Sequence, residues 1–149
     1  MKNMKPLALS ALGYLCSTFP LAIVWHLILF KETYEEIGYI SREDPIFVLG
    51  FLSILIQGVI MSLAFPIFSR SNFTVKAGLR YALAVGVFFW TSHVLAFAAK
   101  GDIHRLDLFI PLETIYLAIQ FSLYGLLLGF FFRQWGTPSR EPKANTESV

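Results

Sequence analysis

Charged residues are scarce in this chain of 149 residues: Asp, Glu, Lys and Arg make up 15% of it, against roughly 25% in soluble domains. Cysteine is almost absent. The single Cys16 excludes an internal disulfide, and its place in a long apolar block predicts a buried, unreactive thiol. The net charge of +2 and the lack of any nucleic-acid-binding motif argue against a DNA or RNA partner. With 56% hydrophobic residues, the composition indicates an integral membrane protein.

Four long apolar runs predict an all-α, up-down bundle of four transmembrane helices, over about residues 6–30, 46–68, 78–99 and 108–132. The first run is longer than the roughly 7–15-residue core of a signal peptide, so we expect an uncleaved first span. Asp44 and Pro45 are typical of a helix start and predict where the second span begins. Residues 133–149 are polar and contain two prolines, which predicts a disordered tail after a membrane domain of residues 1–132.

The distribution of Lys and Arg predicts how the chain is oriented, because cytoplasmic segments carry an excess of these residues. One side of the predicted bundle holds eight of them: Lys2, Lys5, Arg70, Lys76, Arg80, Arg133, Arg140 and Lys143. The other side holds four, which are Lys31, Arg42, Lys100 and Arg105. Both termini should therefore be cytoplasmic, and we expect the chain in a bacterial inner membrane.

Ionisable and amide side chains inside the predicted spans are the candidate site residues, since such groups are costly in lipid and often functional. The candidates are His26, His93, Glu113, Gln57, Gln120 and Tyr116. His26, His93 and Glu113 lie four to six residues below the outer membrane boundary, roughly 6–9 Å deep, and so could share one outward-facing site. Gln57 and Gln120 lie near mid-membrane, and Tyr116 shares a polar helix face with Glu113 and Gln120.

The stretch from Trp25 to Lys31, followed by Tyr34, resembles the end of the first span in bacterial four-helix inner-membrane proteins of unassigned function. The resemblance extends over most of residues 6–132 and implies a membrane domain of unknown function, without any catalytic residue. A faint internal repeat is also present. The pattern His26-x-x-x-Phe30 recurs as His93-x-x-x-Phe97, which suggests two related hairpins.

Three interpretations of these residues remain open. The polar groups could only fix helix packing in an accessory subunit, with each histidine joined to another helix by a hydrogen bond. They could instead line a binding or transport site, and two histidines with a carboxylate suit a divalent metal. As a third interpretation, His26 and His93 could ligate a haem from diagonal helices. Having no cofactor is the simplest expectation, and no nucleophile–base motif supports an enzyme. The bilayer is the expected partner, with a homodimer or a larger membrane complex left open.

Overall fold

The computed structural model describes residues 4–40, 44–70 and 72–137. It confirms the all-α fold, because every regular element in these residues is helical. The elements are, in chain order, α1 (Lys5–Ala22), the π-helical segment η1 (Ile23–Leu29), α2 (Lys31–Glu36), α3 (Phe47–Ser69), α4 (Val75–Trp90), the π-helical segment η2 (Thr91–Leu95), α5 (Ala96–Ala98) and α6 (Leu106–Trp135). Most of the predicted tail lies outside the described residues.

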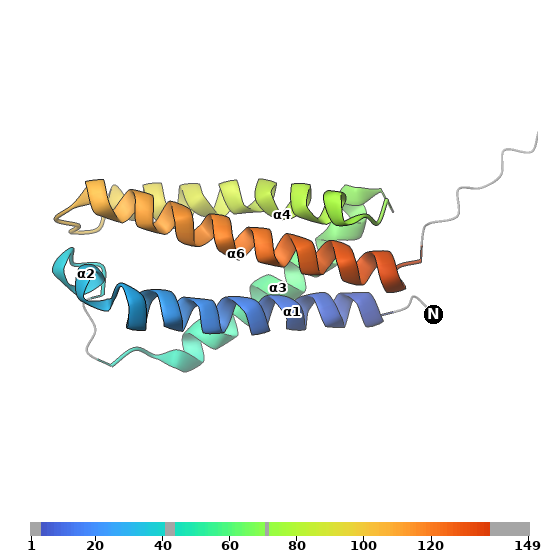
Figure 1. The fold of residues 1–149 in the computed structure, drawn as a ribbon, viewed down its shortest axis with the longest axis horizontal. Coiled ribbons are helices and arrows are strands. Elements are labelled where there is room, and N and C mark those ends of the chain that lie inside the picture. Colours follow the sequence, from blue (N-terminus) through green and yellow to red (C-terminus); the bar gives the residue numbers. More distant parts are fainter. Residues whose placement is uncertain (1–3, 41–43, 71, 138–149) are drawn as a thin grey trace, which may run out of the picture.

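Four helical stretches are long and apolar enough to cross a membrane: Lys5–Leu29, Phe47–Ser69, Val75–Ala98 and Leu106–Trp135. The first joins α1 to η1, and the third joins α4, η2 and α5. Figure 1 shows that α1 begins at the end of the bundle where α6 stops, while α2 lies at the opposite end, here called the α2 end. The chain is therefore a small multi-pass protein whose candidate spans contact a lipid bilayer.

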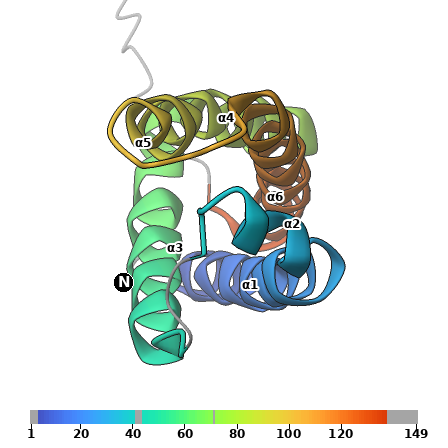
Figure 2. The ribbon, with the colours of Figure 1, turned by 90° about the vertical axis from the view of Figure 1, so that its left-hand side faces the viewer.

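In the view along the bundle, α1 and α4 lie on opposite sides, α6 lies between them on one side, and α3 slants across the other (Figure 2). The α6 helix packs against both α1 and α4, and α3 packs mainly against α1. As a result α1 and α4, which carry η1 and η2, are diagonal, and α6 lies between them. Half of the most apolar window of α6 is buried, against 17–22% for the other spans, so α6 is the most enclosed helix.

The contact between α4 and α6 is close because glycines meet there. A Cβ atom placed on Gly78 of α4 would lie 2.5 Å from the backbone nitrogen of Gly129 and 2.6 Å from the carbonyl oxygen of Gly125. Small residues of this kind let two helix backbones approach, which is the usual way that membrane helices gain packing contacts. This contact holds the two helices that carry His93 and Glu113 against each other.

Three local expectations were wrong. The second span begins at Phe47 with Ile46 as its N-cap and no side-chain cap, because the backbone before it is not helical and Asp44 is too far away to cap it. The last helix continues to Trp135, three residues beyond the predicted end. Cys16 is exposed rather than buried. An apolar block in a membrane protein has lipid on one side and protein on the other, so hydrophobicity alone does not place such a residue.

Candidate functional site

Both membrane histidines lie on π-helical segments, His26 on η1 and His93 on η2. π-helical turns are rare and frequently occur at functional sites. Pro20, which lacks the N–H that continues an α-helix, precedes η1 by three residues. At η2 the hydroxyls of Thr91 and Ser92 bond to the carbonyl of Phe88 and so compete with the backbone ladder. The predicted repeat of two hairpins stays a prediction, although its two histidines share this unusual backbone.

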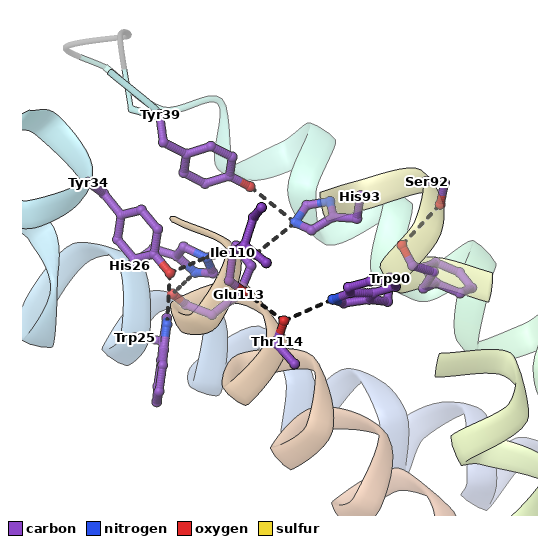
Figure 3. A network of polar contacts seen from close by, with 12 residues as sticks. Trp25, His26, Tyr34, Tyr39, Trp90, Ser92, His93, Ile110, Glu113 and Thr114 are labelled. Carbon is purple, nitrogen blue, oxygen red and sulfur yellow. Dashed lines mark hydrogen bonds and ion pairs between the residues drawn. The ribbon is translucent and has the colours of Figure 1, made fainter. Parts of the chain in front are cut away.

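The side chains of His26, His93 and Glu113 meet at the α2 end of the bundle (Figure 3). His26 Nε2 lies 2.9 Å from Glu113 Oε1, and His93 Nε2 lies 3.1 Å from Glu113 Oε2. The carboxyl group is completely buried, whereas the side chain of His26 is 14% exposed and that of His93 is 42% exposed. The three residues that the sequence places at similar depth are thus in direct contact in the structure.

A third donor reaches the same carboxyl group from outside the spans. The hydroxyl of Tyr34, on α2, donates to Glu113 Oε1 over 2.6 Å and accepts from Trp25 Nε1 over 3.0 Å. Burial, reinforced by the hydrogen bond to Glu113, raises the pKa of Tyr34 well above its usual range. The phenol therefore stays protonated at neutral pH and acts as a fixed donor, oriented by the indole behind it.

The hydrogen bonds of His26 fix the number of protons that it shares with Glu113. Nδ1 lies 3.1 Å from the carbonyl oxygen of Ala22, which only accepts, so Nδ1 carries a proton. A second proton must lie between Nε2 and Oε1, since two lone pairs would repel at that distance. The pair is therefore neutral as a unit, either as imidazolium with carboxylate or as imidazole with carboxylic acid.

The second histidine makes two competing contacts through one nitrogen. His93 Nε2 lies 3.1 Å from both Glu113 Oε2 and the hydroxyl of Tyr39. One ring nitrogen cannot donate to a carboxylate and accept from a hydroxyl at the same time. Burial, with the negative charge of Glu113 nearby, raises the pKa of Tyr39 and keeps its hydroxyl protonated. His93 is thus the less firmly held and more open of the two histidines.

The two predicted amides belong to a separate layer that is built around Tyr14. The hydroxyl of Tyr14 donates to Gln57 Oε1 over 3.0 Å and accepts from Gln120 Nε2 over 2.6 Å. Gln57 also donates to Ser53 over 3.1 Å. Neither amide contacts the histidine–carboxylate cluster through any hydrogen bond of the described residues. Tyr14 was missed in the sequence because nothing about its neighbours distinguishes it from the other aromatic residues of an apolar run.

A cavity of about 540 Å³ connects the two layers. Five of the six candidate residues line it, namely His26, His93, Gln57, Gln120 and Tyr116, while Glu113 does not. The rest of the lining is mostly apolar and comes from all four spans and from Tyr39 and Ile40. A largely apolar space with a few polar groups is the usual form of a small-molecule site.

The geometry does not support a metal at the cluster. Among the described residues, no group of three His, Cys, Asp or Glu side chains is placed to hold a metal ion. In the structure both histidine nitrogens stand at hydrogen-bond distance from the carboxyl oxygens, 2.9 and 3.1 Å, so the three side chains are bonded directly to one another. The same carboxyl group occupies the position between the two imidazoles that a haem would need.

Comparisons with protein-family models, curated proteins and solved structures find no match to this chain. The resemblance to bacterial inner-membrane proteins of unassigned function therefore stays a prediction. What the fold establishes is coarser: a small membrane protein with four candidate spans.

Proposed function

We propose that this protein binds a small amphipathic molecule in the cavity between its four spans. The observation that carries the proposal is the place of the cavity, which extends from the histidines of the cluster to the amide layer. Thr18 and Tyr116, two of its lining residues, are buried, and no hydrogen bond to either hydroxyl is present among the described residues. Buried polar groups normally have partners, so unpartnered ones on a cavity wall suit the polar atoms of a ligand or of water.

The apolar part of the lining points to entry from the bilayer. Ile46, Phe47 and Gly50, at the start of α3, line the cavity and are also exposed on the bundle surface. Figure 1 shows α3 crossing the bundle obliquely, and α3 packs far less against α4 than against α1. An apolar chain dissolved in the membrane can therefore reach the cavity beside α3 without passing through water.

The test is to block the cavity from α3. A Cβ atom on Gly50 would meet nothing within 4 Å, so the Gly50→Phe variant should fold and place its ring at the cavity. We expect about tenfold weaker binding of dansyl-labelled single-chain amphiphiles by detergent-solubilised protein, because excluding two methylene groups of a ligand costs about 1.6 kcal/mol. Binding is followed by dansyl fluorescence, with an alcohol, a carboxylic acid and an amine of one chain length as probes.

The matched control is Val59→Phe, at an exposed position of the same helix that does not line the cavity. This variant should bind all the probes as the unchanged protein does. Failure of all three probes to bind, or equal binding by the Gly50→Phe and Val59→Phe variants, would contradict the proposed function.

An accessory role is the second candidate, and one observation favours it. The Glu113 carboxyl is already satisfied by donors from η1, α2 and η2, as expected of a group that only joins helices. In that case none of the probes would bind, and variants of Glu113 would affect stability alone. A haem-binding role would be recognised by a Soret band in the purified protein.

For the membrane itself, we propose a bacterial inner membrane with both termini in the cytoplasm. The support is the ratio of eight to four Lys and Arg residues between the two sides. A reporter that is active only in the cytoplasm, fused after Thr137, should be active, whereas a periplasmic reporter at the same position should be silent. The opposite pattern would reverse the orientation and place the histidine–carboxylate cluster near the cytoplasmic face.

A further inference from the structure

Two hydroxyl groups on the cavity wall donate no hydrogen bond to any residue that the structure describes. Thr18 is 2% exposed and Tyr116 is 5% exposed. A threonine inside a helix commonly bonds back to the carbonyl one turn earlier, but the Thr18 hydroxyl makes no hydrogen bond of good geometry among the described residues, and the hydroxyl of Tyr14 near it is already bonded to Gln57 and Gln120. The remaining cavity hydroxyl, that of Tyr39, is already in contact with His93. Both hydroxyls can therefore donate a hydrogen bond to an acceptor atom of the ligand.

The charge of the wall points in the same direction. Among the described residues that line the cavity there is no Asp, Glu, Lys or Arg, and the basic side chains on its wall are those of His26 and His93. Glu113 does not reach the wall, and it shares a proton with His26. The described part of the wall thus offers no acidic side chain to pair with a cationic head group. His93 is the more open histidine, and its Nδ1 makes no hydrogen bond among the described residues.

We infer that the ligand is a single-chain amphiphile with a carboxylate head, of the fatty-acid class. The carboxylate accepts hydrogen bonds from Tyr116 and Thr18, and His93, the more open histidine, lines the same cavity. Hydrogen bonds to a charged acceptor are about twice as strong as those between neutral groups, so a carboxylate uses these donors better than an alcohol does. The inference rests on the proposed binding function and adds the chemistry of the head group.

The experiment compares dansyl-labelled acid, alcohol and amine probes of one chain length at about pH 7, where a simple carboxylic acid is ionised. The acid should bind about tenfold more tightly than the alcohol, and the amine most weakly. The Tyr116→Phe and Thr18→Val variants keep the shape of each side chain but remove its hydroxyl. Each should weaken binding of the acid about tenfold, or about 1.4 kcal/mol, and binding of the alcohol much less.

The control is Tyr124→Phe, which removes a hydroxyl two turns further along α6. That hydroxyl bonds to Ser62 over 3.1 Å and does not line the cavity, so the preference for the acid should be unchanged. Thermal unfolding of each variant in the same detergent checks that it is folded.

If the alcohol or amine binds as tightly as the acid, the carboxylate inference is wrong while the cavity remains a binding site. Equal acid preference in the Tyr116→Phe, Thr18→Val and unchanged proteins would also overturn it. Tighter binding of a two-chain anionic phospholipid than of the acid would assign the head-group chemistry to a membrane lipid and overturn the fatty-acid class.

Discussion

Replacing Glu113 by glutamine is expected to lower the free energy of unfolding by about 3 kcal/mol, which is the scale of breaking a buried ion pair. The carboxylate accepts from His26, Tyr34 and His93 with its two oxygens. Glutamine has nearly the same shape but only one acceptor oxygen. Its NH₂ group would point at one or more of the N–H or O–H groups that now donate to the carboxylate. The shared proton of the His26 pair also loses its partner. Unfolding by denaturant in detergent micelles, followed by circular dichroism, measures the change.

The size of this loss separates two roles of the cluster. A hydrogen bond between membrane helices contributes about 0.6 kcal/mol on average. A loss of stability below about 1 kcal/mol would therefore mean that Glu113 contributes no more than an ordinary interhelical hydrogen bond. The control is Glu35→Gln, on the exposed surface of α2, where the carboxylate pairs with Lys31 over 3.6 Å. That change should stay within about 0.5 kcal/mol, because exposed ion pairs contribute little.

Much of the fold could be predicted because the bilayer restricts it. A run of apolar residues long enough to span the membrane can hardly be anything but a helix, so four runs predict four spans. The expectation that His26, His93 and Glu113 share one site came from counting residues to the membrane boundary. This argument used depth alone and needed no knowledge of side-chain direction.

The partners of the cluster could not be predicted in the same way. The connection after Phe30 is rich in acidic residues, which are usually exposed, yet Tyr34 within it is fully buried. Its burial depends on the chain turning at Phe30, where the backbone leaves the helix before α2 begins. Nothing in the sequence marks that turn, because Phe30 is neither glycine nor proline. The turn at Gly38 is different: its φ of +82° is a conformation that favours glycine, and glycine there is a readable signal.

The π-helical segments were also invisible in the sequence. Pro20 supplies no N–H to the helix just before η1, and the hydroxyls of Thr91 and Ser92 bond to backbone carbonyls just before η2. Proline and hydroxyl residues are common in membrane helices without producing such a segment, so their presence did not decide the backbone. By contrast, the spacing Gly125-x-x-x-Gly129 is a known signal of close helix packing and could have located the contact with α4.

The Gly78→Ala variant is expected to lose at least about 3 kcal/mol of stability, the upper end of the cost of overpacking. The new Cβ would lie 2.5 Å from the Gly129 nitrogen and 2.6 Å from both the Gly129 Cα and the Gly125 carbonyl oxygen. All three atoms are backbone, so no side-chain rotation can relieve the clash and the helices must separate. Alanine favours a helix over glycine by about 1 kcal/mol, so any loss has to come from the contact itself.

Gly50→Ala is the matched control, since the same substitution in α3 meets nothing within 4 Å and should raise stability by about 0.5–1 kcal/mol. Equal stability of the two variants would show that α4 and α6 are not held this closely.

The same substitution should also affect the site. The glycine contact sets the distance between α4 and α6, and the 3.1 Å contact of His93 with Glu113 joins the same two spans. Folded Gly78→Ala protein should therefore bind the carboxylic acid probe less tightly as well, although Gly78 lies outside the cavity.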